Sequence, residues 1–119
     1  MGIPRVGLPL VEPLLRHAEK RVAFTGEAYF LEEALRIAEA VSIPVIAVGG
    51  IRSRATAERI LEQTRVSMVS LARPLVRQPG LVSEWEADGG AVASCTSCNR
   101  CYVALGLGQR LRCRAQAGA

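Results

Sequence analysis

The residues of this chain best suited to metal or redox chemistry are four cysteines. All of them lie beyond position 94, as Cys95-x2-Cys98-x2-Cys101-x11-Cys113. Thiolates at such a spacing are typical ligands of an iron–sulfur cluster or of a zinc ion. The chain upstream of them contains no cysteine. The pattern therefore predicts a metal or redox site in the carboxyl-terminal segment and a separate scaffold before it.

A second candidate site follows from two short segments that each come directly after a predicted strand. Gly49-Gly50 follows the run 45–48, and Ala72-Arg73 follows the run 66–71. If both runs are parallel strands, their carboxyl ends meet at one edge of a sheet, where ligands bind. Glycine lets the backbone approach a ligand, and arginine supplies a cation for a phosphate. A lone glycine pair is more often only a tight turn, so the prediction of a phosphate site depends on both segments.

The segments around these runs have helical periodicity. The predicted order is helix 28–41, strand 45–48, a helix capped by Ser53, strand 66–71, a helical turn at Pro74 and helix 81–87. In the second helix we expect Ala57, Ile60 and Leu61 to face inward, and we expect Met68 and Trp85 in the core. The run 45–48 is apolar throughout, which is typical of a strand buried on both faces. This alternation predicts an α/β fold with a parallel sheet and helical crossovers.

Charge and composition indicate which partners and which cellular location to expect. The net charge is +4, and residues 91–119 hold arginines but no acidic residue. This basic segment could face an anionic cluster, a phosphate cofactor or nucleic acid, or could be a solvated tail. The arginines lack interleaved aromatic residues apart from Tyr102, so we expect no nucleic-acid partner. We also expect no membrane association and a cytoplasmic, reducing location, because neither a secretory signal nor a membrane-length apolar run is visible.

Three segments carry a family resemblance. PVIAVGGIRSRATAERIL, VSLARPLVRQPGLVSEWEADG and CTSCNRC, the last with a later cysteine, resemble the carboxyl-terminal part of the old yellow enzyme-like NADH:flavin oxidoreductases. The branch concerned includes relatives of 2,4-dienoyl-CoA reductase and trimethylamine dehydrogenase. The resemblance implies the carboxyl-terminal portion of a TIM (β/α)8 barrel, with strands seven and eight and their helices, followed by a cysteine-rich loop. The expected divisions are a weakly patterned segment 1–26, two β/α units over 27–90 and a cysteine-rich basic segment over 91–119.

The same resemblance implies ligands for both candidate sites. Backbone amides of Gly49, Gly50, Ala72 and Arg73 would hold the phosphate of FMN, with the Arg73 guanidinium as counter-charge. Cys95, Cys98, Cys101 and Cys113 would ligate a [4Fe–4S] cluster, which ranks ahead of zinc and of uncoordinated thiols. The usual spacing in the cluster-bearing relatives has three residues between the second and third cysteine, whereas two stand here. Thr64 also replaces the glycine that usually ends the helix before strand eight, and Ser67 stands where an aspartate is usual.

The sequence thus predicts a fragment of an FMN-dependent NAD(P)H oxidoreductase of the ene-reductase type. We expect no catalytic residue on this chain, because the family's substrate-binding and proton-donating residues lie on earlier strands. A partner chain could supply the rest of the barrel, and NAD(P)H would bind only to the whole enzyme. The alternative is a small metal-binding or electron-transfer module that acts with a partner chain.

Overall fold

The computed structural model describes residues 26–115, which belong to two compact units. The larger unit is described from Gly26 to Cys95, and the smaller one from Thr96 to Ala115. Residues 1–25 of the weakly patterned amino-terminal segment lie outside the described residues.

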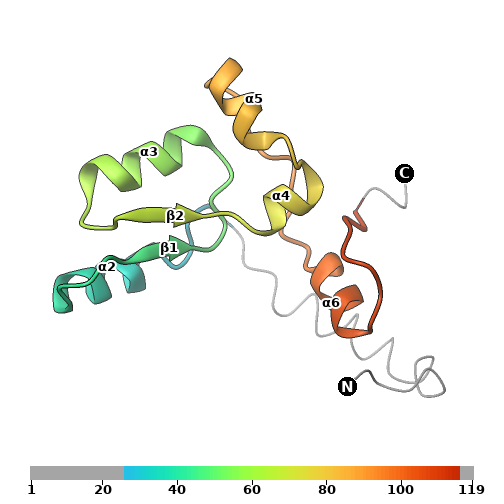
Figure 1. The fold of residues 1–119 in the computed structure, drawn as a ribbon, viewed down its shortest axis with the longest axis horizontal. Coiled ribbons are helices and arrows are strands. Elements are labelled where there is room, and N and C mark those ends of the chain that lie inside the picture. Colours follow the sequence, from blue (N-terminus) through green and yellow to red (C-terminus); the bar gives the residue numbers. More distant parts are fainter. Residues whose placement is uncertain (1–25, 116–119) are drawn as a thin grey trace. The chain divides into compact units, whose positions relative to one another are not determined.

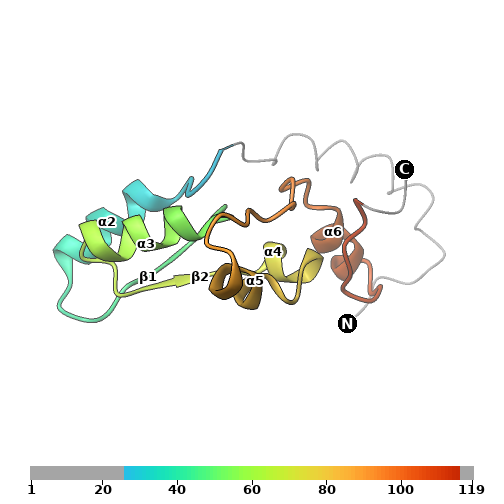
Figure 2. The same cartoon turned by 90° about the horizontal axis from the view of Figure 1, so that it is seen from above.

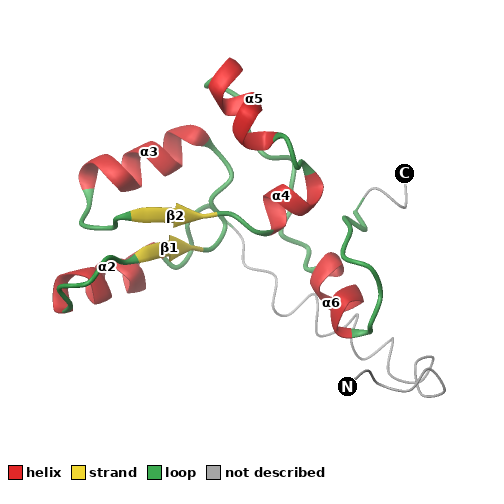
Figure 3. Ribbon diagram, viewed as in Figure 1, coloured by secondary structure: helices red, strands yellow, loops and turns green. Residues whose placement is uncertain are grey.

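The larger unit alternates helices with two short parallel strands (Figures 1 and 3). Its elements are α2 (Leu31–Ala40), β1 (Ile46–Val48), α3 (Arg54–Gln63), β2 (Met68–Ser70), α4 (Arg73–Arg77) and α5 (Leu81–Ala87). The strands pair in register, with Ile46 opposite Met68 and Val48 opposite Ser70. Helix α2 packs along β1 and α3 along β2, and Figure 2 shows both helices on the same face of the strand pair. The predicted α/β alternation is confirmed.

Local signals explain where α3 begins and ends. Ser53 has an extended backbone, and its hydroxyl accepts a hydrogen bond from the Thr56 amide, as a helix N-cap does. At the other end the Thr64 hydroxyl donates to the Ile60 carbonyl at 2.6 Å and accepts from the Val66 amide at 3.1 Å. Thr64 therefore closes the helix with its side chain, which removes the need for a left-handed glycine there.

Within residues 26–115, helices cover the strands on one face only. Ala47 is buried against the helices, whereas Ile46 and Val48 are 51% and 53% exposed. The expectation of a strand buried on both faces is therefore wrong for β1 within the described chain, because both packed helices cover the same face. The same geometry leaves Met68 49% exposed, which corrects its predicted place in the core. In a closed barrel this bare face would point inward, toward the other strands.

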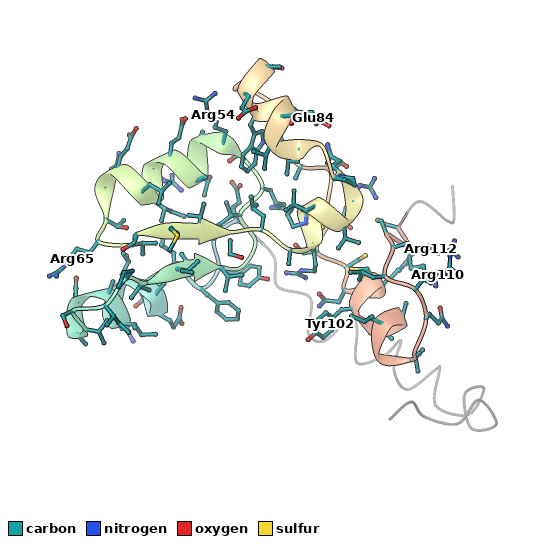
Figure 4. All side chains as sticks on the ribbon, in the orientation of Figure 1. Arg54, Arg65, Glu84, Tyr102, Arg110 and Arg112 are labelled. Carbon is teal, nitrogen blue, oxygen red and sulfur yellow. The ribbon has the colours of Figure 1, made fainter. Side chains whose placement is uncertain are left out.

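The core of the larger unit lies between the strands, α3 and α5. Its buried members are Ala47, Ile51, Ala57, Ile60, Val66, Leu81, Trp85 and Ala93. Leu61, expected to face inward, is 42% exposed, because it stands one position beyond the inward-facing Ile60 on α3. The Arg54 guanidinium donates to the Trp85 carbonyl at 2.8 Å, which ties the start of α3 to α5, and Figure 4 shows Arg54 beside that helix.

The smaller unit contains one described helix, α6 (Arg100–Gly106). It begins after Asn99, which has a left-handed backbone with φ of 59°. Helix α6 lies within the cysteine-rich basic segment predicted over 91–119. Beyond the helix, the Arg114 guanidinium donates to the Gln109 side-chain carbonyl at 2.6 Å. None of the helices within residues 26–115 has the length and hydropathy needed to cross a bilayer.

Candidate functional site

The two predicted phosphate-binding segments lie at the same edge of the sheet. Because β1 and β2 are parallel and in register, their carboxyl ends lie side by side at one edge of the sheet (Figure 1). Gly49-Gly50 follows β1 directly, and Ala72-Arg73 follows β2 and opens α4. The glycines and Arg73 are half-buried, and Ala72 is exposed. The loop before α2 reaches this edge as well, because α2 runs back along β1.

Aromatic rings from that loop pack directly on the glycine turn. Gly49 and Gly50 have φ values of 127° and 71°, which a residue with a side chain rarely adopts. A Cβ atom on Gly49 would lie 2.8 Å from the Phe30 ring, and one on Gly50 would lie 2.6 Å from the Tyr29 ring. Both the backbone conformation and the ring contacts therefore require glycine at these two positions.

Tyr29 connects this turn to Arg73. Its hydroxyl oxygen accepts a hydrogen bond from the Arg73 guanidinium, whose Cζ atom lies 6.0 Å from the centre of the Tyr29 ring. Phe30 meets the Tyr29 ring edge-on, with the ring centres 4.8 Å apart. Sequence reasoning did not select Tyr29. The available signal was an aromatic pair directly before a helix, at the edge where the two glycines were expected.

Glu27 is a second residue that sequence reasoning missed. Its carboxylate accepts hydrogen bonds from the Arg52 and Ser53 amides at 2.7 and 2.6 Å and from the Thr56 hydroxyl at 2.7 Å. Partial burial alone would raise the pKa of this carboxyl. The hydrogen bonds outweigh burial and hold the pKa below its ordinary value. Glu27 thus provides an internal anion at the start of α3, where backbone N–H groups and the helix dipole favour negative charge.

The first cysteine also belongs to this edge. The Ala93 amide donates to the Arg52 carbonyl at 2.8 Å, and the Arg52 guanidinium reaches the Cys95 carbonyl at 3.4 Å. On the other side, the Ser94 amide donates to the Gln78 side chain at 2.6 Å. The segment before Cys95 therefore lies between the chain leaving β1 and the chain leaving α4.

The other three predicted metal ligands, Cys98, Cys101 and Cys113, belong to the smaller unit, and all four cysteines are half-buried. Cys98 stands between two residues with left-handed backbone, Ser97 and Asn99, with φ of 56° and 59°. Among residues 26–115, no three histidine, cysteine, aspartate or glutamate side chains are grouped so that they could hold a metal ion. These thiols have the right donor chemistry but, as they stand, do not form a metal centre. The four-cysteine ligand set stays a prediction.

Comparisons with known proteins give a family and several relatives. The sequence model of a family described as histidine biosynthesis protein matches residues 21–108. A 4,4'-dithiodibutanoate disulfide reductase of Rhodococcus erythropolis is 33% identical over 84 residues, which are 71% of this chain and 21% of the relative. The imidazole glycerol phosphate synthase subunit HisF of Pyrobaculum aerophilum is 37% identical over 92 residues, 69% of this chain and 36% of the relative. A bilirubin reductase of Mediterraneibacter gnavus is 39% identical over 66 residues, 55% of this chain and 10% of the relative.

The chain spans well under half the length of each of these relatives. No solved structure matches it significantly. The matched family has the TIM-barrel fold, and the parallel strands with both packed helices on one face have the arrangement of neighbouring β/α units in such a barrel. The chain belongs to the histidine biosynthesis protein family, and its α/β structure is a portion of a TIM (β/α)8 barrel.

Proposed function

We propose that this chain is part of a flavin-dependent oxidoreductase of the old yellow enzyme-like type and contributes the site for the FMN phosphate. The observation that carries the proposal is the contact of both turns with one side chain: Tyr29 packs on Gly49-Gly50 and accepts a hydrogen bond from Arg73. The relatives named as a disulfide reductase and a bilirubin reductase support redox chemistry.

The residues present fit a phosphate group. The Gly49-Gly50 turn offers backbone N–H groups in a conformation that L side chains rarely adopt, and the Arg73 guanidinium adds a positive charge with several donors. Ala72, directly before Arg73, has a small side chain, so a ligand can approach its backbone. The Glu27 carboxylate already accepts hydrogen bonds from the amides of Arg52 and Ser53. We therefore assign the phosphate contacts to the glycine turn and Arg73 rather than to the start of α3.

FMN, when bound, would accept a hydride from NAD(P)H and pass it on, and the residues of this chain would bind and orient the cofactor. We propose no catalytic residue here. The bare face of β1 and β2, with the exposed Ile46, Val48 and Met68, is suited to packing against further barrel strands. Those strands, supplied by a partner chain or by more of the same protein, would carry the substrate and nicotinamide sites.

A second candidate function is a metal-binding or electron-transfer module that works with a partner chain. The observation that favours it is the position of Cys95, whose backbone is held by Arg52 at the same edge as the glycine turn. In such a module Cys95, Cys98, Cys101 and Cys113 would be the ligands of a [4Fe–4S] cluster. Zinc is the second choice of metal for these thiols.

A third possibility comes from the family match and from HisF, whose name includes a glycerol phosphate compound. A barrel portion of that kind would bind a phosphate-bearing ligand without flavin chemistry. Both barrel functions use a phosphate site, so binding of phosphate alone does not separate them. The flavin does.

The test is a titration of the purified chain with FMN and with riboflavin, which lacks the phosphate. We expect FMN to bind at least tenfold more tightly than riboflavin, a difference of about 1.4 kcal/mol, because the phosphate supplies the charged contacts. Arg73→Gln should remove most of that difference. Arg65→Gln is the matched control, because Arg65 is exposed and Figure 4 shows it at the opposite end of β2. Equal binding of FMN and riboflavin, or equal losses in both variants, would contradict the proposal.

A further inference from the structure

We propose that Tyr29 is a positioning residue that joins the two turns into one site for a phosphomonoester dianion. It does so by holding the Arg73 guanidinium beside Gly49-Gly50. This inference rests on the proposed phosphate site and deepens it, because it assigns how a cation from one β/α unit is oriented toward the amides of another.

The loop that carries Tyr29 is anchored independently of Tyr29 itself. The neighbouring Glu27 binds the Arg52 and Ser53 amides at 2.7 and 2.6 Å. The Gly26 carbonyl accepts from the Arg52 guanidinium at 3.2 Å. Because the loop is attached to the chain leaving β1, a change at the Tyr29 hydroxyl need not displace the loop.

The ring of Tyr29 packs closely against the glycine turn. Its carbon atoms lie 2.6 Å from the position of a Cβ on Gly50 and 2.9 Å from that of a Cβ on Gly49, so the ring rests on glycine surfaces that have no side chain. Phe30 contacts it edge-on at 4.8 Å between ring centres. Such packing limits the positions that the ring can take, and with it the position of the hydroxyl oxygen.

The hydroxyl then restrains Arg73. A guanidinium carries five N–H donors, so one arginine can donate both to a tyrosine hydroxyl and to a phosphate. An unrestrained arginine loses substantial rotamer entropy when it binds an anion. Holding the side chain in place beforehand reduces that loss, which raises affinity without a new contact to the ligand.

The experiment is a double-mutant cycle on the full chain, with inorganic phosphate as the probe. Binding is followed through the amide resonances of Gly49 and Gly50 in proton–nitrogen NMR spectra at constant ionic strength. We expect Tyr29→Phe, which keeps the ring, to weaken phosphate binding about fivefold, because the Arg73 side chain must then be ordered when the phosphate binds. We expect no further weakening when Tyr29→Phe is added to Arg73→Gln, because Tyr29 acts through Arg73.

Tyr102→Phe is the matched control, since Tyr102 is 70% exposed on α6, in the other unit. It should bind phosphate like the wild-type chain, and all variants should keep the wild-type thermal midpoint without phosphate. If Arg73→Gln weakens binding and Tyr29→Phe does not, or if the two losses add, the role of Tyr29 is refuted while the phosphate site stands. If the wild-type chain shows no phosphate response at Gly49 and Gly50, the proposed site fails, and the role of Tyr29 fails with it.

Discussion

The glycine turn with Arg73 and the cysteine segment are two candidate sites organised in different ways. Gly49-Gly50 and Arg73 are placed by paired parallel strands, and side chains such as Tyr29 and Glu27 fasten the loops around them. The cysteines stand on loop and on the first turn of α6, and residues 26–115 contain no group of three potential metal ligands. Backbone pairing fixes the positions of the glycine turn and Arg73 without a bound ligand. A thiolate site, by contrast, commonly takes shape when the metal binds.

The strongest test of this difference is Gly50→Ala. A methyl group there would lie 2.6 Å from the Tyr29 ring, on a backbone with φ of 71°. Left-handed strain and overpacking together should lower the free energy of unfolding by about 2–4 kcal/mol, measured by urea denaturation.

Gly106→Ala provides the control for that substitution. A Cβ at Gly106 meets nothing within 4 Å, and this glycine lies in α6. Alanine there should be neutral or stabilising by up to about 1 kcal/mol. If Gly50→Ala is as well tolerated as Gly106→Ala, the glycine turn is not the preorganised element described above.

A smaller effect is expected for Glu27→Gln. The side-chain amide can accept at one oxygen but places its NH2 group where donors now point, so we expect a loss of about 1–3 kcal/mol at pH 7. Glu32→Gln is the control, because that carboxylate is exposed and pairs with Arg36 on the helix surface.

The Glu27 effect should also depend on pH in a defined direction. The pKa of Glu27 is lowered on folding from its ordinary value of 4.5, so the carboxylate stabilises the fold fully above that value. The stability difference between wild type and Glu27→Gln should therefore shrink as the pH falls below about 4.5 and through the folded-state pKa. A difference that stays constant from pH 7 to pH 3 would contradict the anionic role of Glu27.

The smallest effect on the larger unit is expected from changing Cys98 and Cys101 to serine together. If these thiols are metal ligands, anaerobically reconstituted chain should lose its iron or zinc in metal analysis, along with any cluster absorbance. Unfolding of the larger unit, followed by Trp85 fluorescence, should change by less than about 0.5 kcal/mol, because neither cysteine belongs to it. Equal metal content in variant and wild type would remove these cysteines from the ligand set.

Much of the local structure could be predicted because it depends on neighbours in sequence. The apolar stripe of α2, the Ser53 cap and the extent of α5 all follow from side chains within one or two helical turns. The exposure of Ile46 and Met68 could not be predicted, because an apolar run does not reveal whether further strands cover it.

Residue types alone were enough to place glycines and an arginine after two predicted strands, and thereby to predict that they meet at one edge of a parallel sheet. Tyr29 and Arg73 are 44 positions apart, and Glu27 is 25 positions from Arg52, so no short-range pattern joins them. Their meeting depends on helices that return the chain to the same edge, and only the folded arrangement revealed which side chains fasten the turns.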